Sequence, residues 1–206
     1  MSMNNIKFFF VILVLLNCFV FLAPKESLSN TLLFNAEKKV ASMLDELKIA
    51  MVEGSQNPKE GKKLLNDLLN KYYDSELIAK YTTMPYWKKA TNLERESFSL
   101  IFKNYLIDLA SDWFKAFVDV NYKVTSSDLR GKSFVVVDIL IIDPGTKRHN
   151  TKLSFRLKIN ANSLKIIDVE IENISMILIQ NDEFKSIIRR NKGEFNSLIN
   201  TLMENE

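Results

Sequence analysis

The N-terminal half of the chain repeats the hydrophobic spacing of amphipathic helices. From residue 32 to 53, and again from 64 to 72, apolar residues recur every three or four positions with polar residues between them. Pro58 lies between these stretches and suits the first turn of a second helix, where a missing N–H leaves no bond unmade. Asp74 is a suitable N-cap for a shorter third helix. The spacing therefore predicts three consecutive helices.

A longer helix is predicted to begin after Thr91 and to run to about Phe117. Thr91 and Glu94 form the T-x-x-E pattern of a capping box. One face of this helix carries an aromatic stripe that consists of Phe98, Phe102, Tyr105, Trp113 and Phe117. Such a stripe can fill a solid core or line an apolar cavity, because both require apolar side chains that face inward. The pattern leaves both interpretations open.

The hydrophobic period changes to two after this helix, which is typical of β-strands. Apolar residues alternate with polar ones, or run continuously, in the four segments 118–125, 133–142, 153–159 and 167–171. Short turns separate these segments, so we expect an antiparallel meander. Two short helices, 182–191 and 194–204, are predicted to close the chain.

This order of elements, with helices first and strands later, is typical of an α+β fold. Three of the four predicted strands have one apolar and one polar face, so the N-terminal helices should pack on one face of a single sheet. Segment 133–142 is apolar on both faces apart from Asp138, which indicates a central strand or one covered on both sides.

The first residues have the character of a targeting segment. Residues 8–23 are almost wholly apolar and follow Lys7, but the run is shorter than the roughly 20 residues of a spanning helix. A short apolar run behind a positive charge favours a secretory signal peptide, and Ser27 and Ser29 supply the small residues that cleavage requires. We therefore predict that residues 1–29 are removed and that 30–206 form a single domain. The alternative is an uncleaved membrane anchor; acylation at Cys18 is disfavoured because the residue before it is not small.

The composition excludes several classes of function. The chain has 28 basic and 25 acidic residues and a net charge of +3, which is too balanced for a protein that binds nucleic acid through bulk charge. Cys18 and His149 are the only cysteine and histidine, so a zinc site, a disulfide framework and a Ser–His–Asp triad are disfavoured. No glycine-rich phosphate loop occurs. The sequence therefore predicts neither a metal nor a cofactor.

Asp138 is the one residue that suggests catalysis, because it interrupts an apolar strand. A buried carboxylate can act as a general base. The alternatives are an ion pair with Arg156 or Lys158, or a position on a solvent-facing edge. A structural role is favoured, since no second acid or histidine accompanies Asp138.

Several segments between residues 36 and 204 resemble the MlaC family of periplasmic phospholipid carriers, also called toluene-tolerance proteins. The resemblance rests on Tyr73-Asp74, on the segment from Trp87 to Thr91 and on the spaced Phe98 and Phe102. It continues through Leu164–Ser175, which contains K-I-x-D-V-x-I, and through the Phe-bearing helix around Phe184. The chain departs from the family at Asn173, where a glycine is common, and at Asn181 or Asp182, where an arginine is common.

The resemblance implies a cone-like α+β fold with a curved sheet, similar in shape to nuclear transport factor 2. It implies a cavity between sheet and helices that holds phospholipid tails and leaves the headgroup near solvent, with no covalent chemistry and with phospholipid as cargo rather than as a cofactor. The expected partners are an outer-membrane lipoprotein–porin complex and an inner-membrane ABC transporter. Such a carrier works in the periplasm as a monomer and maintains the lipid asymmetry of the outer membrane.

The cavity walls are predicted on the apolar strand faces and on the aromatic face of the long helix. The predicted wall residues are Trp87, Phe98, Phe102, Tyr105, Trp113, Val120, Tyr122, Val135, Val137, Ile139, Leu153, Phe155, Leu157 and Val169. Two other functions stay open at this point. One is a small α+β enzyme that uses Asp138, and the other is a periplasmic adaptor with a filled core and no ligand.

Overall fold

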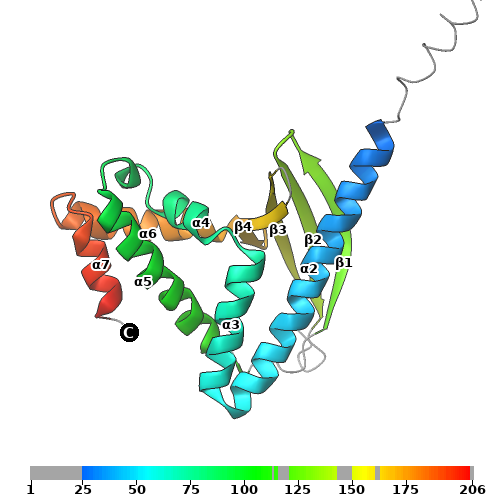
Figure 1. The fold of residues 1–206 in the computed structure, drawn as a ribbon, viewed down its shortest axis with the longest axis horizontal. Helices are drawn as coiled ribbons and strands as arrows, with labels where there is room; N and C mark the ends of the chain where they lie inside the picture. Colours follow the sequence, from blue (N-terminus) through cyan, green and yellow to red (C-terminus); the bar gives the residue numbers. More distant parts are fainter. Residues whose placement is uncertain (1–24, 113, 116–120, 143–149, 161–162, 205–206) are drawn as a thin grey trace, which may run out of the picture.

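The computed structural model describes residues 25–112, 114–115, 121–142, 150–160 and 163–204 (Figure 1). The apolar N-terminal run, Cys18, Trp113, Val120 and His149 lie outside the described residues. The signal peptide therefore stays a prediction; the described chain begins at Lys25 within a helix that includes Ser29.

The predicted N-terminal helices are present, and Asp74 and Thr91 cap their helices as the sequence indicates. Helix α2 spans Lys25–Gln56, α3 spans Pro58–Tyr72, α4 spans Ser75–Thr82 and α5 spans Asn92–Ser111, with a 3₁₀ turn, η1, at Tyr86–Lys88. Asn57 accepts a hydrogen bond from the backbone N–H of Glu60, and Asp74 accepts one from Leu77. Thr91 and Glu94 complete the capping box in both directions.

Helix α5 is shorter than predicted. It ends at Ser111 rather than near Phe117, because the chain turns there and buries Phe114 against the α2–α3 hairpin. The aromatic spacing continued past this point in the sequence, so the period alone did not mark the end of the helix.

The sheet is antiparallel and open, and its strands follow chain order from β1 to β5. The strands are β1 (Asn121–Arg130), β2 (Phe134–Ile142), β3 (Thr151–Asn160), β4 (Ser163–Ile171) and β5 (Ile174–Ser175). The fifth strand was not predicted, because two paired residues give no measurable period. It follows a tight turn in which Glu172 and Asn173 have φ of 50° and 65°, as the central residues of a type I′ hairpin do.

Helix α6 (Met176–Arg190) and helix α7 (Asn196–Met203) close the chain. Helix α6 begins earlier than predicted, because Ser175, the last residue of β5, caps the helix at once by accepting a hydrogen bond from the N–H of Leu178. The two terminal helices pack on each other, α6 also packs on α4 and β4, and α7 packs on α5.

The molecule has two packed regions that meet along β4 and α3 (Figure 1). Helix α2 runs along one face of the sheet over β1 and β2, and α3 returns beside it. Helices α4, α5, α6 and α7 gather on the far side of α3 and form a second core of their own. The predicted α+β architecture, with N-terminal helices on one face of an antiparallel sheet, is confirmed.

No helix in the described part of the chain combines the length and the apolar character needed to cross a bilayer. The same residues bring together no group of three or more histidine, cysteine, aspartate or glutamate side chains that could hold a metal ion.

Candidate functional site: an apolar cavity between helices and sheet

A cavity of ≈ 340 Å³ lies between α2, α3, the C-terminal half of α5 and the inner face of the sheet. Its volume is within the range of about 300–1,000 Å³ that is usual for small-molecule sites. The helices contribute Met43, Leu44, Leu47, Lys48, Met51, Leu65, Leu68, Leu69, Leu106, Ile107 and Ala110. The cavity is completed by Tyr73 and by the strand residues Tyr122, Ile141, Leu153, Phe155 and Val169.

The helical periods explain why these side chains meet. On α2, Met43, Leu47 and Met51 recur every four residues, so they lie on one face of the helix. On the strands, Leu153 and Phe155 lie two residues apart and therefore point to the same face of the sheet. The hairpin of α2 and α3 holds the helical wall above the strand wall.

The few polar groups in this wall are occupied or uncharged. The Tyr122 hydroxyl donates to the Ala41 carbonyl oxygen at 3.0 Å and to Asp45 Oδ1 at 2.7 Å. Burial, with the nearby Asp45 carboxylate, raises the pKa of Tyr122 to about 12. The Tyr73 hydroxyl contacts Met43 Sδ at 3.9 Å. Burial raises the pKa of Tyr73 above its ordinary value. Both phenols are therefore neutral at physiological pH, and among the described residues Lys48 is the one ionic side chain in the wall.

Helices α2 and α3 touch each other beside the cavity. A Cβ atom at Gly61 would clash with the Cα of Gly54, so the two helices meet through glycine backbone. The Phe114 ring covers this contact, since a Cβ at Gly54 would lie 2.5 Å from it. Phe114 packs in one cluster with Met51 and Ile107, which also line the cavity. The glycine contact and the Phe114 ring thus form a packed region that adjoins the cavity wall.

The structure brings part of the predicted wall to this cavity and places the rest in packed core. The predicted residues that line the cavity are Tyr122, Leu153, Phe155 and Val169. Those packed in the layer between the sheet and α2 are Val135, Val137, Ile139 and Leu157, each fully buried. Those packed among α5, α6 and α7 are Trp87, Phe98, Phe102 and Tyr105. The remaining two, Trp113 and Val120, lie outside the described residues.

The aromatic face of α5 does not face the sheet because the C-terminal helices offer it aromatic partners. The Phe98 ring stacks on Phe102 at 5.4 Å between centroids and meets Phe184 edge-on at 5.7 Å. Only the later turns of α5, at Leu106 and Ala110, reach the cavity. These residues and the cavity residues of α2 and α3 were not predicted from the sequence. Its apolar spacing identified their inner faces but carried no signal that part of such a face borders a void.

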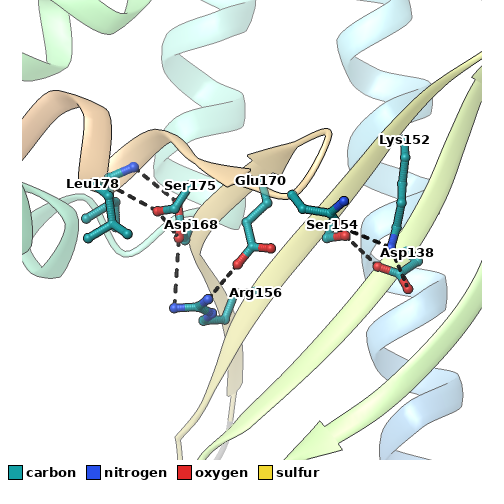
Figure 2. Close-up of polar contacts among 10 residues, drawn as sticks. Asp138, Lys152, Ser154, Arg156, Asp168, Glu170, Ser175 and Leu178 are labelled. Carbon is teal, nitrogen blue, oxygen red and sulfur yellow. Dashed lines mark hydrogen bonds and ion pairs between the residues drawn. The ribbon is translucent and has the colours of Figure 1, made fainter.

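Asp138 lies on the opposite face of the sheet from the cavity, since its neighbours Val137 and Ile139 point inward (Figure 2). It accepts hydrogen bonds from the hydroxyls of Ser154 and Ser126 and lies 3.7 Å from the Lys152 ammonium. Partial burial opposes its charge, but those bonds and the nearby Lys152 and Arg130 charges outweigh it and lower the pKa of Asp138. Of the structural alternatives that the sequence left open for Asp138, an ion pair is present, but its partner is Lys152 rather than Arg156 or Lys158.

Arg156 belongs instead to a second polar cluster, also drawn in Figure 2. Its guanidinium lies 2.6 Å from Glu170 and 3.9 Å from the buried carboxylate of Asp168. Asp168 also accepts a hydrogen bond from Ser175 at 2.7 Å and one from the N–H of Ile177 at 3.3 Å. A carboxylate at a helix N-terminus stabilises that end of the helix, so this cluster anchors α6 to β4 and has a structural role.

Asn181, where the resembling family often has arginine, also serves packing. Its side-chain amide is buried and donates to the carbonyl oxygens of Tyr81 at 3.0 Å and Met84 at 2.8 Å. It thereby joins α6 to the end of α4, at the cis peptide bond that precedes Pro85.

Comparisons with known proteins agree with this architecture. The model of the family described as MlaC protein matches residues 37–204. A solved structure of a phospholipid-binding protein from Ralstonia solanacearum, in complex with a phospholipid, superposes with a TM-score of 0.70 at 16% sequence identity. The match covers 82% of this chain and 95% of that chain. No curated protein matches the chain.

Proposed function

Because this chain belongs to the MlaC family, we propose that it carries a phospholipid, with acyl chain sheltered in the cavity beneath α2 and α3. The observation that carries this proposal is the wall itself, which consists of aliphatic, methionine and aromatic side chains with two neutral phenols and a single ionic residue, Lys48. The Ralstonia solanacearum protein of similar fold was solved with a phospholipid bound.

The energetics of a lipid in water explain why such a wall is needed. A diacyl lipid buries about 30 methylene groups in a membrane, at about 0.8 kcal/mol each, so transfer into water costs about 24 kcal/mol. A carrier has to replace much of that shelter. It has little need of polar headgroup ligands, which fits a wall with so few polar atoms.

We further propose that the chain works in the periplasm as a monomer, after export by its N-terminal segment and cleavage near Ser29. In this proposal it moves lipid between an outer-membrane lipoprotein–porin complex and an inner-membrane ABC transporter, and so maintains the lipid asymmetry of the outer membrane. The support is the family membership together with the short apolar run behind Lys7.

We propose binding rather than catalysis. Asp138, the one candidate base from the sequence, lies on the face of the sheet away from the cavity. Its lowered pKa makes it a weaker base than an ordinary aspartate.

The proposal is tested by lipid analysis of the full chain purified from a periplasmic extract. We expect a stoichiometric phospholipid in native mass spectra and in extracted phosphorus. Leu153→Asp sets a carboxylate against the acyl chain and should lower the lipid content about tenfold or more. Leu153→Met nearly conserves volume and should retain lipid. A wild-type chain that is folded and free of phospholipid would overturn the proposal and favour a ligand-free adaptor.

A further inference from the structure

A second hollow lies on another side of α2 and shares no lining residue with the apolar cavity. It is an open groove of ≈ 800 Å³ between the N-terminal half of α2, the end of α3 and the adjoining ends of β3 and β4. Its lining residues are Leu32, Asn35, Lys38, Lys39, Ser42, Glu46, Lys71, Tyr72, Ile159, Asn160, Ser163 and Leu164. The apolar cavity presents almost no charge, whereas this groove presents three lysines.

The positive charges of the groove are only partly compensated. Glu46 is the acidic residue of the lining, and it is already held by the Lys71 ammonium at 2.6 Å and the Tyr72 hydroxyl at 2.7 Å. Within the described part of the chain, Lys38 and Lys39 have no carboxylate within 4.0 Å. The groove therefore carries a net positive charge.

The ammonium groups are also gathered rather than spread. Lys39 Nζ lies 5.4 Å from the centroid of the Tyr72 ring, and Lys71 Nζ lies 5.0 Å from the same centroid. Lys165 is fixed nearby, since its ammonium donates to the Asn70 and Lys71 carbonyl oxygens at the end of α3. Burial first, and then the charges of Lys165 and Lys71, lower the pKa of Lys39. Such a concentration of like charge favours an anion bound among the lysines.

We propose that this groove binds a phosphate group, either as free phosphate or as the headgroup of an anionic lipid. Lysine ammonium groups act as point charges toward phosphate oxygens. The amide and hydroxyl groups of Asn35, Ser42 and Ser163 line the same groove and supply further hydrogen-bond donors. The groove shares no lining residue with the cavity that holds the proposed cargo. A negative result for phosphate binding in the groove would therefore leave the proposed function untouched.

The test uses the full folded chain and two matched pairs of substitutions. Lys38→Gln with Lys39→Gln removes two charges from the groove. Lys88→Gln with Lys89→Gln removes the same net charge from two adjacent exposed lysines outside the groove. Circular dichroism melts identify any variant that fails to fold. If the variant with both Lys38→Gln and Lys39→Gln fails to fold, Lys38→Gln alone takes its place.

Binding is measured to vesicles of phosphatidylcholine with and without phosphatidylglycerol, and separately to inorganic phosphate and glycerol 3-phosphate by calorimetry. We expect the wild-type chain to bind the anionic vesicles or the free phosphate probes with an affinity that weakens as the salt concentration rises. This affinity should fall about tenfold or more in the Lys38→Gln, Lys39→Gln variant and stay unchanged in the Lys88→Gln, Lys89→Gln variant. Binding to anionic vesicles without binding of free phosphate assigns the site to a lipid headgroup, and competition by free phosphate assigns it to the phosphate group itself. Equal losses in both pairs, or no binding of any phosphate probe, would overturn the proposal.

Discussion

The helical cluster and the cavity wall of this molecule are built from different side chains, and only the helical cluster is filled. The helical cluster among α4, α5, α6 and α7 contains Trp87, Phe98, Phe102, Phe184 and Phe195, whose rings meet edge-on or stacked at 5.4–6.5 Å. The helical wall of the cavity is mainly leucine and methionine. The contrast indicates that hydrophobicity alone does not decide whether an inward face becomes core. An inward face becomes core where a neighbouring element offers side chains that pack against it. A face without such partners borders a void.

Helix α5 belongs to both regions, so the two kinds of packing can be compared within one helix. Its first turns place Phe98 and Phe102 in the helical cluster. Leu106 packs against that cluster and also lines the cavity, and Ala110, one turn later, lies in the cavity wall. Substitutions along this helix should therefore change from costly to tolerated within a few turns.

The largest expected effect separates the two ends of α5. Phe98 is fully buried among aromatic rings, so Phe98→Ala should lower the free energy of unfolding by about 3–5 kcal/mol. Leu106→Ala should cost less than about 2 kcal/mol in lipid-free protein, because its side chain already borders a void. Urea unfolding followed by circular dichroism measures both. Equal losses at the two positions would mean that the cavity is not empty in the lipid-free protein.

Adding bulk should have opposite consequences in the packed layer between the sheet and α2 and in the cavity. Val137 is fully buried between the sheet and α2, so Val137→Trp should overpack that layer and cost about 1–3 kcal/mol or more. Leu106→Trp directs an indole into the cavity and should change stability by less than about 1 kcal/mol. The second variant should instead carry less phospholipid per folded molecule. Thermal melts beside lipid phosphorus assays check the pair, and normal lipid content in Leu106→Trp would contradict it.

The contact of Gly54 with the Phe114 ring should behave as packed core, although Phe114 shares its cluster with two residues of the cavity wall. Gly54→Ala improves helix propensity by about 1 kcal/mol, but its Cβ meets the Phe114 ring, so a net loss of about 1–2 kcal/mol is expected. In a Phe114→Leu background the clash is relieved, and the same substitution should become neutral or stabilising. A double-mutant cycle from urea unfolding measures this coupling. Additive effects would indicate that ring and glycine do not touch.

The smallest effect is expected on the outer face of the sheet. The folded-state pKa of Asp138 lies below its usual 3.8, so its charge stabilises the fold at neutral pH. That stabilisation is lost as the pH falls from about its usual pKa through the lower folded value. Asp138→Asn should cost less than about 1 kcal/mol at pH 7, lose its effect in acid, and leave lipid content unchanged. Unfolding at pH 7 and at pH 3, with lipid analysis, tests this, and lost lipid at full stability would revive a functional role.

Much of the fold was predictable because local signals and tertiary structure agree in it. Pro58, Asp74 and the Thr91–Glu94 box each mark a real helix start, since capping depends on residues within one turn. Alternation likewise located three strands, and a continuous apolar run located β2. The two-residue β5 and the early start of α6 were missed, because a tight turn followed at once by a cap leaves no room for a period.

The site was less predictable, because a cavity depends on which faces meet. The inward strand residues Leu153, Phe155 and Val169 were found from alternation. Phe98 and Phe102 were expected opposite the sheet, but α6 and α7 lie against them instead. Sequence spacing gives the direction of a side chain relative to its own helix and says nothing of the distance to the next element.

The division of α5 also bears on how the family can vary among species. A side chain locked between rings can be replaced only by one of nearly the same size and shape, whereas a side chain that borders the void can be exchanged for any apolar one. Homologous chains should therefore hold volume nearly constant at Phe98 and Phe102 and drift in volume, while staying apolar, at Leu106 and Ala110. Natural variation could in this way resize the cavity for different membranes without disturbing the part of the helix that keeps the protein folded.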